Sequence, residues 1–265
     1  MKKINVLIIV LCLVFAGCSK VSVSNDNDSN GTLKYVANGE DFIREGFVTK
    51  DGWSLEFEHV FITLSDVKAY QTNPPYDSKK GDISDYEVVN ALKEDSYTVD
   101  LAAGDEDAEP ILLDKVKVQE GFYNAVSWEV RKDKDGNSLT IEGTATKDDK
   151  SIPFYIAFDQ QFKFVGGEYI GDERKGIVEK DEESEIEMTF HFDHLFGDGS
   201  LPEDDELNTT AIGFTPFYNE NEDNIHIEVK DLANVFSDEE LKHIDEILST
   251  LGHVGEGHCH SEMID

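Results

Sequence analysis

Cysteine is scarce in this chain of 265 residues, which has only Cys12, Cys18 and Cys259. Cys12 lies in an N-terminal segment with the features of a signal peptide, and Cys18 follows the small residues that precede a lipidated cysteine. The mature chain would keep Cys259 as its one free thiol, which excludes an intramolecular disulfide. A lone thiol in an exported protein indicates metal ligation, a disulfide to another chain or a reducing environment.

Positively charged residues are also few. The chain has 23 Lys and Arg against 57 Asp and Glu, and its formal net charge is −34. A field of this sign repels nucleic acid and anionic lipid surfaces and concentrates cations. We therefore exclude nucleic acid as a partner. The acidity indicates a cation-handling role or an adaptation to salty surroundings, and the two are compatible.

Long apolar runs are missing beyond the N-terminus, where the run from Ile4 to Phe15 is too short to span a bilayer. Together with the preceding lysines and the following Ala-Gly-Cys, it predicts a lipoprotein signal peptide over residues 1–17, cleaved before Cys18. Lipid on Cys18 would anchor the protein in the cell envelope, at the outer membrane if the host has one. Residues 18–31 are rich in Ser, Asn, Asp and Gly and predict a flexible tether.

Catalytic motifs are absent from the sequence. It contains no Gly-x-Ser-x-Gly elbow, phosphate-binding loop, dinucleotide fingerprint or His-Glu-x-x-His helix. Because carboxylates occur throughout, no pair of acids stands out as a glycosidase site. We therefore expect a protein that is not an enzyme. A metal-dependent hydrolase that uses His191 and His194 is the least favoured alternative.

Strand patterns dominate the chain from about Thr32 to Ile227. Alternating or β-branched runs include Ser54–Leu64, Asn124–Val130 and Ser138–Thr146, with turn residues between them. The pattern predicts a mainly β fold, an antiparallel β-sandwich over residues 32–235.

One helix is expected, over residues 236–252. Ser237 and Glu240 form a capping box at its start, and Gly252 marks its end. Apolar side chains recur at helical spacing along it: Leu241, Ile244, Leu248 and Leu251. Docked on the sandwich, this helix would hold a flexible His/Cys-rich tail, residues 253–265, at one edge of the domain.

The tail concentrates metal-binding side chains. His253, His258, Cys259 and His260 fall within eight positions. Imidazole and thiolate are donors that zinc and copper prefer. The glycines between them would let the backbone wrap an ion, although ordering it costs entropy. A solvated terminus is the alternative interpretation.

A second candidate group follows the last long strand pattern. Alternation places His191 on the face opposite Phe190 and Phe192, and Asp193 and His194 come where the strand ends. A His-x-x-His spacing can bring two imidazoles to one ion, with Asp193 as a third ligand or as an acceptor that fixes a ring. An ordinary polar strand end is the alternative. The sequence leaves open whether this group and the tail meet.

A third segment has the oxygen ligands of a degenerate calcium loop: Asn219, Asn221, Asp223 and Asp231. Asn224 occupies the position of the turn glycine, and Lys230 takes the twelfth place counted from Asn219. Calcium is therefore a further candidate ion, against an ordinary polar turn.

The order of several motifs resembles a group of little-characterised bacterial envelope lipoproteins. The segments are DGWSLEFEHVFITLSDV, ILLDKVKVQEGFYNAVSWEV, IEGTATKDDKSIPFYIAF, HFDHLFGD and GEGHCH. In that group a His-x-Asp-His-Leu-Phe stretch precedes a calcium-loop-like segment. More distantly, the layout is similar to the periplasmic copper-binding proteins associated with methanobactin. The resemblance implies an exported β domain with these metal ligands: His191, Asp193, His194, His258, Cys259 and His260.

Together these features predict an extracytoplasmic lipoprotein that binds zinc or copper for sequestration, delivery or sensing. Its expected partners are the metal ion, the membrane through the N-terminal lipid and an envelope protein. The alternative is a non-catalytic surface interaction or scaffold module whose acidity reflects adaptation to salt.

Overall fold

The computed structural model describes residues 31–167, 175–255 and 257–265. The predicted signal peptide and Cys18 lie outside the described residues, as does the predicted tether apart from Gly31, which opens the first strand. Among the described residues, 44% lie in strands and 17% in helices, which confirms the mainly β, sandwich-like fold.

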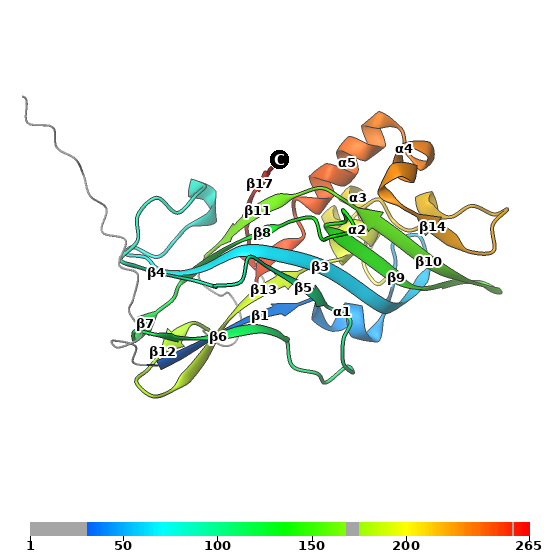
Figure 1. The fold of residues 1–265 in the computed structure, drawn as a ribbon. Coiled ribbons are helices and arrows are strands. Elements are labelled where there is room, and N and C mark those ends of the chain that lie inside the picture. Colours follow the sequence, from blue (N-terminus) through cyan, green and yellow to red (C-terminus); the bar gives the residue numbers. More distant parts are fainter. Residues whose placement is uncertain (1–30, 168–174, 256) are drawn as a thin grey trace, which may run out of the picture.

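The larger sheet has ten strands, and most of them lie on the path β14-β10-β9-β3-β8-β11-β17 (Figure 1). The long strand β3 lies in the middle of this path and also pairs with β2, β4 and β5. The strand bounds are β2 (Phe47–Val48), β3 (Ser54–Gln71), β4 (Val88–Ala91), β5 (Ser96–Asp100), β8 (Ala125–Val130), β9 (Leu139–Lys147), β10 (Lys150–Phe158), β11 (Phe162–Gly166), β14 (Ile225–Ile227) and β17 (His260–Met263).

A second sheet of five strands has the order β16-β15-β13-β1-β6, and β7 and β12 form a separate pair. The bounds are β1 (Gly31–Asn38), β6 (Ile111–Val118), β7 (Gly121–Phe122), β12 (Ile177–Val178), β13 (Glu183–Phe190), β15 (Gly252–Val254) and β16 (Gly257–His258). β1 pairs with β13 in parallel, as β10 does with β14. These two parallel pairs correct the predicted antiparallel sandwich in detail only, because strand direction depends on pairing between distant segments.

The hydrophobic core lies where the two sheets face each other. Along β13, Ile186, Met188 and Phe190 are buried at alternate positions. Trp128 of β8 stacks on Phe164 of β11 and meets Phe190 edge-on, with ring centroids 5.5 and 6.1 Å apart. Glu185, Glu187 and Thr189 alternate with them and point to the other face.

The predicted capping box is present at the longest helix, α5 (Asp238–Leu248). The Ser237 hydroxyl accepts a hydrogen bond from the Glu240 amide, and the Glu240 carboxylate accepts one from the Ser237 amide. The helix is shorter than predicted, because Ser237 is its cap and Gly252 already belongs to β15. The other helical segments have three to six residues: α1 (Glu40–Glu45), α2 (Asp193–Phe196), α3 (Glu206–Thr210), α4 (Leu232–Val235), η1 (Ser78–Lys80), η2 (Thr215–Phe217) and η3 (Val229–Asp231).

None of the helices in the described part of the chain is long and apolar enough to cross a membrane.

The structure corrects the prediction of a flexible tail. β15 pairs with β13 and with β16, and β17 pairs with β11, so the segment extends both sheets. Gly252 lies flat against the Phe164 ring, where a Cβ atom would approach a ring carbon to 2.4 Å. This glycine therefore permits close packing, whereas the sequence alone suggested flexibility.

Candidate metal centre

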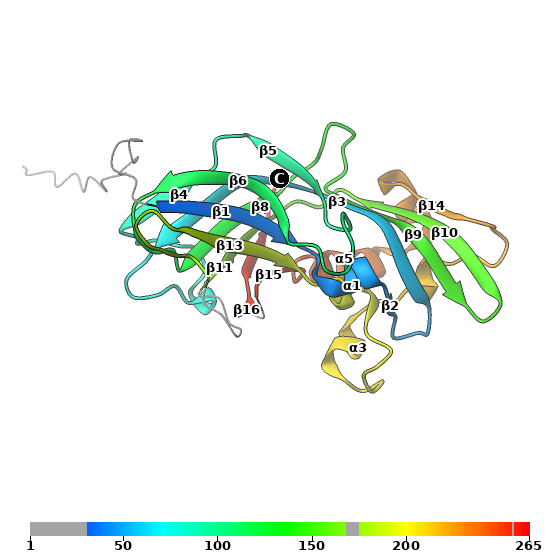
Figure 2. The same cartoon turned by 90° about the horizontal axis from the view of Figure 1, so that it is seen from below.

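Four histidines from two distant segments meet at one end of the five-stranded sheet. His191 follows β13 directly and His194 lies in α2, whereas His253 and His258 belong to β15 and β16. The antiparallel pairing of β15 with β13 places His253 opposite Thr189, next to the strand end (Figure 2). The β15-β16 hairpin then sets His258 opposite His253. Strand pairing therefore joins the two groups that the sequence left separate.

Three of these imidazoles are close enough to share one ion. A ligand atom from each of His191, His194 and His253 lies within 4.8 Å of the others. The rings of His191 and His253 are stacked, with centroids 3.9 Å apart, and His194 meets His253 nearly at a right angle at 5.0 Å. The His258 ring lies beside them, 4.5 Å from His253 and 5.9 Å from His194.

His253 is buried without adequate polar partners. Its exposed fraction is 2%, and neither ring nitrogen makes a well-formed hydrogen bond to any residue that the structure describes. The backbone of Thr250 acts on this ring only weakly. A buried polar group without a partner costs about 1–3 kcal/mol, so such a group needs an explanation. A bound cation would supply the missing partner for one nitrogen.

The environment keeps His194 and His253 neutral. Burial, followed by the charge that His191 would carry, lowers the pKa of His194 from 6.5 to about 4. The same two causes hold the pKa of His253 far below its usual range. Because only a neutral imidazole has a lone pair for a metal, these rings are ready to bind one at neutral pH.

Thr250 fixes the tautomer of His194. Its hydroxyl donates to the Ile247 carbonyl oxygen at 2.7 Å, which uses its only hydrogen. The hydroxyl oxygen lies 2.9 Å from His194 Nδ1 and must therefore accept a hydrogen bond from it. Protonation at Nδ1 leaves Nε2 with the lone pair, so His194 presents Nε2 to a metal.

Two carboxylates flank the group. Glu40, the first residue of α1, has Oε1 3.1 Å from His191 Nε2. Its backbone is held at a φ of 60° and donates a hydrogen bond to Asn38 Oδ1. Burial raises the pKa of Asp193, and its Oδ1 is buried without a hydrogen-bond partner among the described residues. Asp193 nevertheless lies outside the group of three that can share an ion.

The thiol of Cys259 faces away from the imidazoles. Its sulfur lies beside Gly166 of β11, on the same side as Val254, whereas His253 points to the opposite side of β15. Burial raises the pKa of this thiol, which keeps it protonated. The structure thus does not place Cys259 with His191, His194 and His253.

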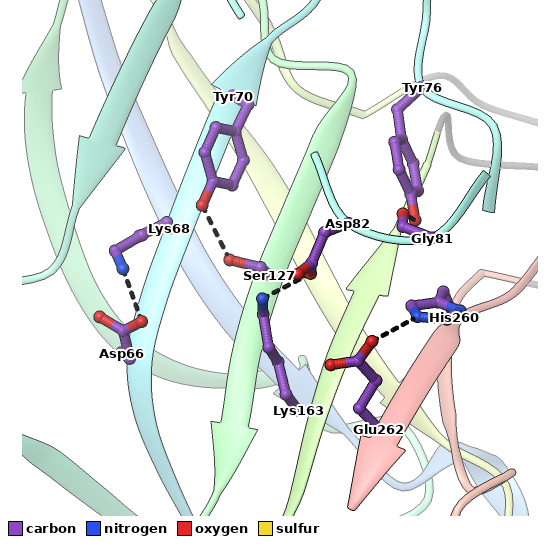
Figure 3. A network of polar contacts seen from close by, with 10 residues as sticks. All are labelled: Asp66, Lys68, Tyr70, Tyr76, Gly81, Asp82, Ser127, Lys163, His260 and Glu262. Carbon is purple, nitrogen blue, oxygen red and sulfur yellow. Dashed lines mark hydrogen bonds and ion pairs between the residues drawn. The ribbon is translucent and has the colours of Figure 1, made fainter. Parts of the chain in front are cut away.

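His260 belongs to another surface. It lies in β17, and its Nε2 is 3.3 Å from Glu262 Oε1. Figure 3 shows this pair beside the ion pair of Lys163 with Asp82 and the hydrogen bond of Tyr70 with Ser127, on the larger sheet.

The calcium-loop-like segment forms a polar turn. Asn219, Asn221 and Asp223 are exposed, and Asn219 Oδ1 accepts hydrogen bonds from Asn221. Strand β14 then separates this turn from Asp231, which lies at the end of η3. The three-residue segments η2 and η3 flank this stretch, in place of the two helices that flank the loop of an EF-hand.

A cleft opens beside the imidazole cluster. Its volume is about 370 Å³, and its lining combines histidines and Thr250 with residues of α3: His194, His258, Thr250, Glu206, Leu207 and Thr210.

Sequence reasoning missed Glu40, Thr250 and this cleft. Glu40 is some 150 positions from His191, and nothing in its local sequence links the two. Thr250 lies three positions before His253 in the sequence, and this short spacing was the only signal that it could belong to the site.

Comparison with known proteins gives no match to a family, to a curated protein or to a solved structure. The resemblance to envelope lipoproteins stays a prediction, and the function has to be argued from the site itself.

Proposed function

We propose that the protein binds one divalent transition-metal ion through His191, His194 and His253. The observation that carries this proposal is His253, whose two ring nitrogens are buried without well-formed hydrogen bonds inside a cluster of imidazoles. Packing two further histidines against such a ring has no evident benefit for folding. It is the arrangement expected of a metal site.

The donor set favours zinc or copper. Imidazole suits both ions, and the thiol of Cys259, the donor that would favour Cu⁺, points elsewhere. Thr250 at His194 and Glu40 at His191 provide the outer contacts that orient metal-binding histidines. The formal charge of −34 raises the local concentration of cations around the molecule.

The sequence places this activity outside the cytoplasm. A lipoprotein signal and a lipid on Cys18 would hold the domain at the envelope, where it would sequester, deliver or sense the ion. His258 is exposed and His194 only half-buried, so the ion could exchange with its surroundings. This accessibility supports a cargo or signal ion more than a purely structural one.

Elemental analysis of the full-length protein, purified without a histidine tag, tests the proposal. We expect one zinc or copper ion per chain, and loss of that ion in His253→Ala. His226→Ala is the matched control, because His226 is an exposed histidine of β14 next to Glu228. Absence of stoichiometric metal, or equal metal content in the two variants, contradicts the proposal.

A further inference from the structure

We infer that the bound ion keeps one coordination position open toward the α3 cleft and binds a small monodentate ligand there. This inference rests on the proposed function and adds an accessible reactive position to it.

The cluster has a closed side and an open side. His191 and His253 are 8% and 2% exposed; His191 directly follows β13, and His253 lies in β15. His194 and His258 line the cleft, together with Thr250 and three residues of α3. A cleft of about 370 Å³ is several times larger than one water molecule, so a small ligand fits within it.

The number of ligands leaves a vacancy on the open side. Zinc sites usually have four ligands, and sites that bind exogenous molecules have three protein ligands and one open position. Only His191, His194 and His253 lie within 4.8 Å of one another among the described residues. His258 is exposed and not a member of that group, so the fourth position falls to a ligand from the cleft.

The chemistry of the cleft favours small donors. Thr210 supplies a hydroxyl that can hydrogen-bond a ligand on the ion, whereas the Thr250 hydroxyl is already bonded to Ile247 and His194. Glu206 adds a carboxylate at the same opening, which disfavours multiply charged anions most. Water, or a small nitrogen or oxygen donor, is the ligand class that this opening fits.

Cobalt substitution gives a direct test. Co²⁺ replaces zinc in imidazole sites, and its visible spectrum reports changes in its ligands. We expect azide, titrated into the cobalt-loaded full-length protein, to give a saturable spectral change at one azide per cobalt. Metal analysis of the same sample measures cobalt content separately.

Two substitutions in α3 test whether azide reaches the ion through the cleft. Thr210→Trp should fill the cleft and weaken azide binding about tenfold or more, a loss of about 1.4 kcal/mol. Thr209→Trp is the matched control, because Thr209 is equally exposed on α3 but does not line the cleft. Thermal unfolding of both variants establishes that they are folded.

Three results would overturn the inference. They are a cobalt-loaded protein that does not respond to azide, a response that appears only in His258→Ala, and equal azide affinity in the two Trp variants. The second result would make His258 the fourth ligand. In each case cobalt is still bound and the proposed function stands, whereas failure to bind cobalt would count against that function.

Discussion

Glu40 Oε1 lies 3.1 Å from His191 Nε2, although the two residues are far apart in the sequence. A carboxylate in this position favours a proton on Nε2 and leaves Nδ1 of His191 for a metal. The same contact holds the His191 ring in one orientation, so we expect it to increase the affinity for the metal.

We predict that Glu40→Ala lowers metal affinity by about 10- to 100-fold, the usual effect of removing such an outer contact. Competition with a chromophoric chelator measures it. Asp41→Asn is the control, because Asp41 is an exposed neighbour in α1. Equal affinity in Glu40→Ala and the natural protein would show that Glu40 has no part in the site.

Replacing Thr250 tests the tautomer of His194. Thr250→Val keeps the shape but removes the hydroxyl that accepts from Nδ1. We expect a loss of about tenfold in affinity by the same competition assay, and nearly full affinity in Thr250→Ser, which retains the hydroxyl. If Val and Ser variants bind equally well, the hydrogen bond does not set the tautomer.

Replacing Cys259 or His260, which lie away from the imidazole cluster, should change the metal content little. Cys259 lies beside Gly166, and His260 pairs with Glu262. Both Cys259→Ala and His260→Ala should therefore retain one metal ion per chain in elemental analysis. A marked loss of metal in Cys259→Ala would mean that the thiolate is a ligand, as the sequence suggested.

The metal-free protein should be destabilised by mild acid. The pKa of His253 is lowered in the folded state, whereas unfolded histidine titrates near 6.5, so below that pH the unfolded chain binds more protons. The stability that the neutral His253 contributes is fully present above about pH 6.5. It is lost as the pH falls below that value. The cluster cannot accept protons without charging rings that lie against one another.

Urea unfolding of the metal-free protein at pH 7.5 and pH 5.0 measures the effect. We expect His253 to account for about 1–2 kcal/mol of the loss between these values. His253→Gln, which does not titrate, should lose correspondingly less. A variant with the same pH dependence as the natural protein would contradict a buried neutral His253.

Local patterns were sufficient to predict the β character, the capping box of Ser237 with Glu240 and the histidines of the candidate site. These features depend on side-chain alternation or on neighbours a few residues apart. The meeting of His191 with His253 depends on β15 pairing with β13, and a non-local pairing of this kind leaves no mark on either segment.

The side of a strand on which a candidate metal-binding residue lies also could not be predicted from the local sequence. A strand reverses its side chains at each residue, so the register of β15 decides that His253 joins the cluster. Cys259, between β16 and β17, has its sulfur beside Gly166. Close spacing in the sequence had suggested one shared site for both.

Anomalous X-ray diffraction at the metal absorption edge, from crystals of the metal-loaded protein, tests the central claim most directly. We predict one peak among His191, His194 and His253, about 2.0–2.1 Å from a nitrogen of each ring if the ion is zinc. A peak at Cys259 and His260, or no peak within the imidazole cluster, would contradict the account.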